Sequence, residues 1–82
     1  MKIVERVLSV GMFGDDVREL HGQLERLHFF LPPGERGFGF FGPVTRKAVM
    51  DVQLERFHPN RVNGLVDQAT ANLISEEARW NG

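Results

Sequence analysis

The 82-residue sequence contains no cysteine, which excludes a disulfide framework and a cysteine-based zinc site. It has no excess of basic charge either, because ten Lys and Arg stand against eleven Asp and Glu. Such a chain lacks the positive surplus that neutralises a nucleic-acid backbone. No apolar run approaches the roughly 20 residues that cross a bilayer. We therefore expect no nucleic-acid partner and no membrane partner.

The first residues, Met1 to Arg6, are interrupted by charge before an apolar stretch can form, so they predict no secretory signal peptide. With 41% hydrophobic and 26% charged residues, the composition is that of a folded globular domain. A chain of this length has no room for a second hydrophobic core. We expect residues 1–82 to form a single domain that is a module of a larger protein.

Periodic apolar residues predict a first helix in the stretch that follows two aspartates. Asp15 and Asp16 place negative charge where the positive end of a helix dipole would lie. His28 to Leu31 should end this helix, since Pro32 and Pro33 forbid its continuation. The spacing of a buried helical stripe is shown by Val17, Leu20, Leu24 and Leu27.

Two further helices are predicted from their start signals. Gly42 suits a helix N-cap and Pro43 the first helical position, and this helix should end at about residues 58–60. Asp67 is a good N-cap for the next helix, with Thr70 placed to complete a capping box. The expected inward-facing residues of the two helices are Ala48, Val49, Val52, Leu73 and Ile74.

Residues 32–42 are expected to form a long loop that contains four Gly and three Phe. We expect Phe41 to pack in the core. For Phe38 and Phe40 two interpretations stay open: one ring lies exposed and stacks on a sugar face or a peptide, or both rings seal the loop. Residues 2–10 are expected to form an extended arm or a brief strand. The predicted fold is all-α, a small three-helix bundle with this N-terminal arm and this Gly/Phe loop.

An internal repeat links the starts of the second and third predicted helices. When Gly39 is set on Gly64, 25 residues later, Thr45 falls on Thr70. The shared pattern is Gly, any residue, an apolar residue, a cap, two residues and Thr, followed by an apolar pair. A weaker third copy begins at Gly14, with Leu20 in register with Ala48 and Leu73. Each glycine permits a turn that other residues resist.

The sequence resembles the peptidoglycan-binding domain family in three motifs that occur in the family's order. They are Leu8-x-x-Gly11-x-x-Gly14-x-Asp16-Val17-x-x-Leu20, then Gly39-x-Phe41-Gly42-Pro43-x-Thr45-x-x-Ala48-Val49, and finally Asn63-Gly64-x-Val66-x-x-x-Thr70-x-x-x-Ile74. Val52-Gln53 stands where the family often has Phe-Gln. The sequence also departs from the family's usual pattern: Phe38 replaces an acidic residue, His21 replaces a Gln, and Asp67 stands where a second Gly is common.

The resemblance implies a three-helix module that binds bacterial cell-wall peptidoglycan, its glycan strand or stem peptide, without catalysis or cofactor. Such modules usually target an attached protein or enzyme, often a covalently linked catalytic domain, to the wall. This function requires the periplasm, the cell wall or the extracellular space. The candidate ligand-binding residues are Phe38, Gly39, Phe40, Phe41, Gly42, Thr45 and Arg46.

Structural roles compete with ligand contact at several of these positions. Thr45 is expected to cap a helix, Gly39 to satisfy a turn, and Arg46 either to sit in solvent or to pair with a stem-peptide carboxylate. His21 and His28 are too few for a zinc site, which needs three or four ligands, and we expect solvated or capping roles for them. No metal and no catalytic residue are predicted.

Two other classes of function stay open on sequence grounds. A protein-interaction or pro-segment-like docking domain can use the same fold, because a fold does not fix a function. A helix-turn-helix DNA binder would use the helix that begins near Thr45, but the balanced charge argues against it. An independent enzyme is the weakest hypothesis, since no G-x-S-x-G, H-E-x-x-H or Walker motif is present.

Overall fold

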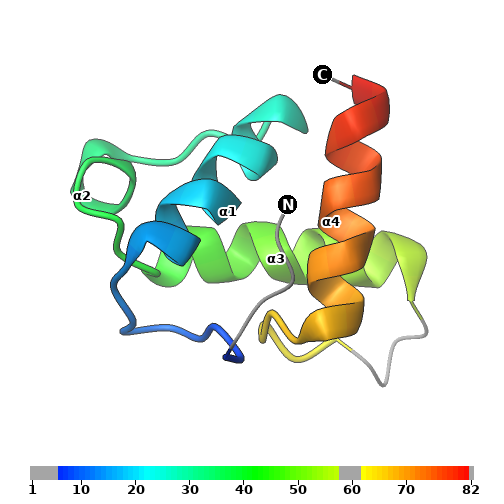
Figure 1. Cartoon of the computed structure of the whole chain (residues 1–82), viewed down its shortest axis with the longest axis horizontal. Helices are drawn as coiled ribbons and strands as arrows, with labels where there is room; N and C mark the ends of the chain where they lie inside the picture. The colour runs from blue at the N-terminus through cyan, green and yellow to red at the C-terminus, as the bar shows by residue number, and fades with distance from the viewer. Residues whose placement is uncertain (1–5, 58–61, 82) are drawn as a thin grey trace.

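The computed structural model of the chain describes residues 6–57 and 62–81 and is all-α. Its helices are α1 (Asp15–Arg26), α2 (Pro33–Arg36), α3 (Pro43–Arg56) and α4 (Gln68–Asn81). Figure 1 shows α3 extending across the molecule, with α1 and α4 packed beside each other against it. The three long helices confirm the predicted bundle. Within the described ranges, no helix is long and apolar enough to span a bilayer.

The helix starts agree with the predicted caps more closely than the ends do. Helix α1 stops at Arg26, and His28 has a left-handed φ of 72°, a conformation that commonly ends a helix. At the start of α4, Asp67 Oδ1 accepts the Thr70 N–H at 2.9 Å, as a capping aspartate should. The predicted end of α3 at residues 58–60 lies outside the described residues, but α3 has ended by Arg56.

The expectation of a loop over all of residues 32–42 was wrong in one respect. Residues Pro33–Arg36 form the one-turn helix α2, with Pro33 at its first position, where a missing N–H costs nothing. The Phe40 N–H then donates to the Glu35 carbonyl at 3.0 Å and turns the chain back toward α3. Helix α2 thereby fixes the position of the Glu35 side chain, which becomes important at the site.

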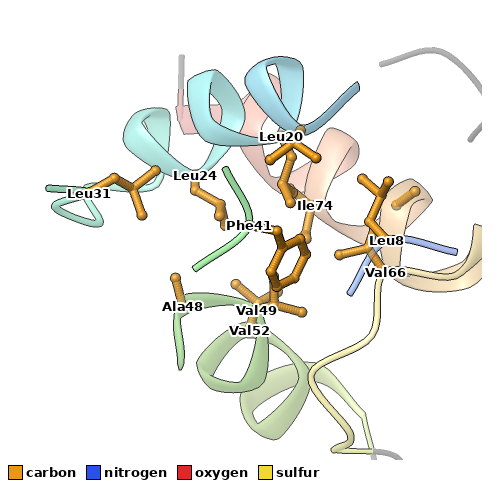
Figure 2. Packing of buried hydrophobic residues seen from close by; sticks show 12 residues of the cluster. Leu8, Leu20, Leu24, Leu31, Phe41, Ala48, Val49, Val52, Val66 and Ile74 are labelled. Carbon is orange, nitrogen blue, oxygen red and sulfur yellow. The ribbon is translucent and has the colours of Figure 1, made fainter. Parts of the chain in front are cut away.

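Phe41 lies at the centre of the hydrophobic core, as predicted. Its side chain has no exposed surface, and Figure 2 shows its ring surrounded by residues from the three long helices and the arm. Leu31 and Val66 enter the same cluster from the connecting segments. The other buried members are Leu8, Val17, Leu20, Leu24, Ala48, Val49, Val52, Ala71 and Ile74.

The N-terminal arm is described from residue 6 to residue 13 and contains a turn, at which the Met12 N–H donates to the Ser9 carbonyl at 3.2 Å; residues 2–5 of the predicted arm lie outside the described residues. Leu8 pairs with Val66 through two backbone hydrogen bonds of 2.9 and 3.1 Å. Further along, Phe41 donates its N–H to the Met12 carbonyl and accepts the Gly11 N–H, both at 2.8 Å. These are isolated bridges rather than a strand. They hold the arm against both helix-start turns.

The internal repeat is visible in the backbone. Gly39 and Gly64, which the repeat aligns, have φ of 61° and 74°, in the left-handed region that favours glycine. Gly11 has φ of 96° and lies 28 residues before Gly39, the displacement that also sets Leu20 on Ala48. The third copy therefore begins at Gly11 rather than at Gly14.

Gly22→Ala is expected to raise the free energy of unfolding by about 0.5–1 kcal/mol. Gly22 lies inside α1, and no atom lies within 4 Å of an added Cβ, so alanine fits without strain. Urea denaturation monitored by circular dichroism measures the change. Gly64→Ala is the matched comparison and should lower stability, because its positive φ penalises a Cβ. A loss of stability in Gly22→Ala would contradict the described packing of α1.

Candidate functional site

A buried carboxylate holds the start of α3, beneath the turn that carries the candidate site. Glu35, 5% exposed, accepts the Val44 N–H at 3.0 Å and the Thr45 N–H at 2.8 Å. It also accepts the Thr45 hydroxyl at 2.6 Å. The N-cap residue Gly42 has no side chain to do this, and a Cβ there would lie 2.4 Å from the Glu35 Cδ. Glycine at position 42 thus makes room for a cap supplied by α2.

The Glu35 carboxylate is held in its charged form. Burial by itself would raise its pKa, but hydrogen bonds from Thr45, Val44 and Gly42 outweigh burial and lower the pKa below its usual value. The positive end of the α3 dipole favours the same charge state. Sequence reasoning missed Glu35, because it lies nine and ten residues before the two N–H groups that it caps.

His21 belongs to the same buried network, which corrects the expectation of a solvated or capping role. Its side chain has no exposed surface, and Nε2 lies 2.9 Å from Thr45 Oγ1. Because the Thr45 hydroxyl donates to Glu35, its oxygen accepts the proton on His21 Nε2. Burial first and the charge of Arg36 second lower the His21 pKa, so the ring is neutral at pH 7. His28 lies beyond the end of α1 and is exposed.

A second polar anchor, Gln53 on α3, holds the start of α4 in the same way. Its Nε2 donates to Thr70 Oγ1 at 3.1 Å, and its Oε1 accepts the Gly64 N–H at 3.0 Å. Thr70 therefore bonds to α3 through its hydroxyl, where the sequence predicted a capping box. Thr45 and Thr70 are each tied by a polar side chain of the preceding long helix. The repeated sequence pattern therefore corresponds to a repeated contact, in which a threonine at a helix start bonds to the long helix before it.

The seven candidate residues fall into an interior group and a surface group. Phe41 and Thr45 have no exposed surface, and Gly39 and Gly42 are buried, so these four shape the site from within. Three candidates have exposed or partly exposed side chains: Phe38, which is 68% exposed, Phe40, which is partly exposed, and Arg46, which is exposed. The interpretation that both rings of the loop are sealed is wrong for Phe38.

Phe40 stacks on a residue that sequence reasoning did not select. The rings of Phe40 and Phe13 have centroids 4.8 Å apart and planes at 35°, and Phe13 is 60% exposed. The backbones pair at the same point, since Gly14 donates its N–H to the Gly39 carbonyl at 3.2 Å. We call Phe13, Phe38 and Phe40 the aromatic surface. One sequence signal could have revealed Phe13. When Gly11 is set on Gly39, Phe13 falls on the apolar position that Phe41 occupies in the next copy of the repeat.

The arginine beside this surface is Arg18, whereas the sequence suggested Arg46. A Cβ on Gly39 would lie 2.8 Å from Arg18 Nε and 2.9 Å from Arg18 Cγ, so that side chain lies along the turn between Phe38 and Phe40. The Arg46 side chain lies instead along the turn at Gly64, with Cγ and Nε 3.0 Å from the equivalent position. The two arginines hold equivalent places in successive copies of the repeat.

Two surface hollows lie away from the aromatic surface. One, of about 310 Å³, is lined by Leu27, Phe29, Val52, Glu55, Arg56 and Glu77. The other, of about 320 Å³, is lined by Asn72, Ser75, Glu76, Arg79 and Trp80 on the outer face of α4. Within residues 6–57 and 62–81, His and acidic side chains do not gather in groups of three or more that could hold a metal ion.

Most of the chain matches a known protein family. Residues 13–74, about three quarters of the sequence, match the family described as Putative peptidoglycan binding domain. This span begins at Phe13 and includes the whole aromatic surface, α1 to α3 and the first half of α4. No curated protein matches the chain closely enough to count as a relative. On the family match, the chain belongs to the peptidoglycan-binding domain family.

Proposed function

We propose that this domain binds bacterial cell-wall peptidoglycan through the aromatic surface and catalyses no reaction. Membership of the peptidoglycan-binding family gives the class of ligand. The observation that carries the location is the pair Phe13–Phe40, which stays on the surface together with Phe38 while Phe41 fills the core. Grouped exposed apolar side chains, unlike single ones, are a feature of interaction and ligand-binding sites.

The chemistry of the surface suits a saccharide that carries a peptide. Aromatic rings present a broad apolar face with little conformational freedom to lose, so they can stack on the C–H face of a sugar ring or on a side chain. The arm and the Gly39 turn are joined by backbone hydrogen bonds, which hold the two stacked rings in place before a ligand arrives. A preformed surface avoids the cost of ordering on binding.

The buried polar groups beneath the surface act as structure in this proposal. Glu35, the most buried carboxylate of the described residues, accepts three hydrogen bonds at the start of α3 and is almost completely shielded from solvent. Neutral His21 is enclosed behind Thr45. We infer that these groups hold the turn in shape rather than move protons on a ligand.

The domain, residues 1–82, would serve as a targeting module for an attached protein in the periplasm, the wall or the extracellular space. A single shallow aromatic surface gives weak affinity, and covalent linkage to another wall-binding or catalytic domain multiplies the effect of a weak site. The alternative, in which the same surface docks on a protein partner, predicts that the domain ignores cell walls and binds a polypeptide.

Phe38→Ala combined with Phe40→Ala should weaken binding to insoluble peptidoglycan sacculi by roughly tenfold or more, since buried aromatic contacts dominate many interfaces. Co-sedimentation of the purified domain with sacculi over a range of concentrations gives the dissociation constant. Phe30→Ala is the matched control, because Phe30 is also highly exposed, at 78%, but lies in the segment between α1 and α2. It should bind as the parent does.

Soluble muropeptides should displace the parent domain from the sacculi. If the parent stays in the supernatant at concentrations well above a weak dissociation constant, the wall-binding proposal fails and the protein-docking alternative takes its place. If the parent sediments but the double phenylalanine variant sediments equally well, the ligand is the expected one and the aromatic surface is the wrong location.

A further inference from the structure

Arg18 is a cation beside the aromatic surface, and it takes no part in the buried hydrogen-bond network beneath that surface. It projects from the first turn of α1, and its side chain is 55% exposed. Its ion pair to Asp15 Oδ1 is long at 4.0 Å, and the Asp15 side chain is fully exposed. Ion pairs of this kind contribute about 0–1 kcal/mol, so a ligand carboxylate can replace Asp15 at little cost.

The backbone at Gly39 holds the Arg18 side chain in place. The absence of a Cβ at Gly39 leaves the space in which Arg18 Cγ and Nε lie, and the Gly14 carbonyl closes the same space at 3.0 Å. The apolar stem and Nε therefore pack on the turn, while the side chain as a whole remains 55% exposed, as long cationic side chains commonly do. Phe38 and Phe40 precede and follow the glycine that Arg18 covers, so the charge lies at the turn that carries both residues.

A second arginine near this surface, Arg6, is already engaged. Arg6 donates from Nε and Nη2 to the two carboxylate oxygens of Asp16 at 2.9 and 3.1 Å, and from Nη2 to the Phe13 carbonyl at 2.7 Å. These bonds hold the arm to α1 and fix the backbone at Phe13. Among the residues that the structure describes, Arg18 has only its long ion pair to Asp15, which leaves its donors available to an incoming anion.

We propose that Arg18 binds a free carboxylate of a peptidoglycan stem peptide whose sugar or side chain covers Phe38 and Phe40. The proposal rests on the function proposed above and adds a specificity to it. A guanidinium presents parallel N–H donors that match the two oxygens of a carboxylate. A neutral sugar alone has no group of this kind. The domain should consequently prefer stems with free carboxylates over stems whose carboxylates are amidated.

Arg18→Met tests the inference, because methionine keeps an apolar stem over Gly39 while it removes the charge. Binding of two purified muropeptides, one with free stem carboxylates and one with the same carboxylates amidated, is measured by titration calorimetry at low and at physiological salt. The parent should bind the acidic form roughly tenfold more tightly, and Arg18→Met should lose this preference. Arg46→Met, the equivalent change at the Gly64 turn, should keep it.

The outcomes separate this inference from the function on which it rests. If Arg18→Met keeps the preference for the acidic form, or if the parent binds both forms equally while it still sediments with sacculi, the role of Arg18 is overturned and wall binding stands. If the parent binds neither muropeptide nor sacculi, both proposals are overturned. Urea denaturation of Arg18→Met should give parent-like stability, which excludes misfolding as the cause of a loss.

Discussion

Phe41→Ala should lower the free energy of unfolding by about 3–5 kcal/mol, the range found when a buried phenylalanine is truncated. Phe41 is the largest side chain of the core and has no exposed surface. Its ring touches the space between all three long helices and the arm (Figure 2), so its removal leaves a cavity that no single element can close. A domain of this size has a total stability of only about 5 kcal/mol or slightly more.

Urea denaturation followed by far-ultraviolet circular dichroism at pH 7 measures this change. We expect Phe41→Ala to be largely unfolded near 37 °C, whereas Phe41→Leu, which refills most of the volume, should remain folded with a smaller loss. Phe30→Ala is the control for removal of an exposed phenylalanine, and its stability should change by no more than about 0.5 kcal/mol. A mild effect of Phe41→Ala would mean that Phe41 is not the centre of the core.

Glu35→Gln should lower the free energy of unfolding by about 3 kcal/mol at pH 7. The carboxylate accepts three hydrogen bonds from Val44 and Thr45, and the amide of glutamine turns one acceptor into a donor that faces a backbone N–H. Hydrogen bonds to a charged group are stronger than neutral ones, and a buried unpaired donor adds a further cost. Glu76→Gln, at an exposed glutamate of α4, is the matched control and should have little effect.

The pH dependence gives a sharper test of the same residue. The folded-state pKa of Glu35 lies below its ordinary value of 4.5, so its stabilising effect is complete above that value and is lost as pH falls through the folded pKa. The stability gap between the parent and Glu35→Gln should therefore be constant near neutrality and close in acid. A gap that persists unchanged at pH 3, or one that widens on acidification, would contradict the charged cap.

His21 also makes the parent protein lose stability as the pH is lowered. Its folded-state pKa lies below its ordinary value of 6.5, because burial disfavours the imidazolium. The unfolded chain therefore binds a proton that the folded protein refuses, and stability falls as pH drops below about that value. This loss begins at a higher pH than the loss from Glu35, which separates the two groups along the titration.

The sequence determined the helices and the repeat of this protein, because their signals are local. Apolar spacing in α1, the capping residue Asp67 and the pair Gly42-Pro43 each act over a few residues, and the structure has a helix start at each. The burial of Phe41 also followed from sequence, since the repeat placed it on the apolar position that Val66 occupies in the next copy. Helix α2 could not be predicted from the sequence, since a helix of a single turn has too few residues to show the helical spacing of apolar residues.

Only the tertiary structure decided which side chains meet at the surface. Phe13 reaches Phe40, and Arg18 reaches Gly39, because the arm and α1 lie beside a turn more than twenty residues away in the chain. Local patterns carry no information on such contacts, which depend on how the helices pack. The same holds for Glu35. A glutamate in a predicted loop is expected to be exposed to solvent. Its burial becomes favourable only when the unpaired N–H groups of α3 are brought to it.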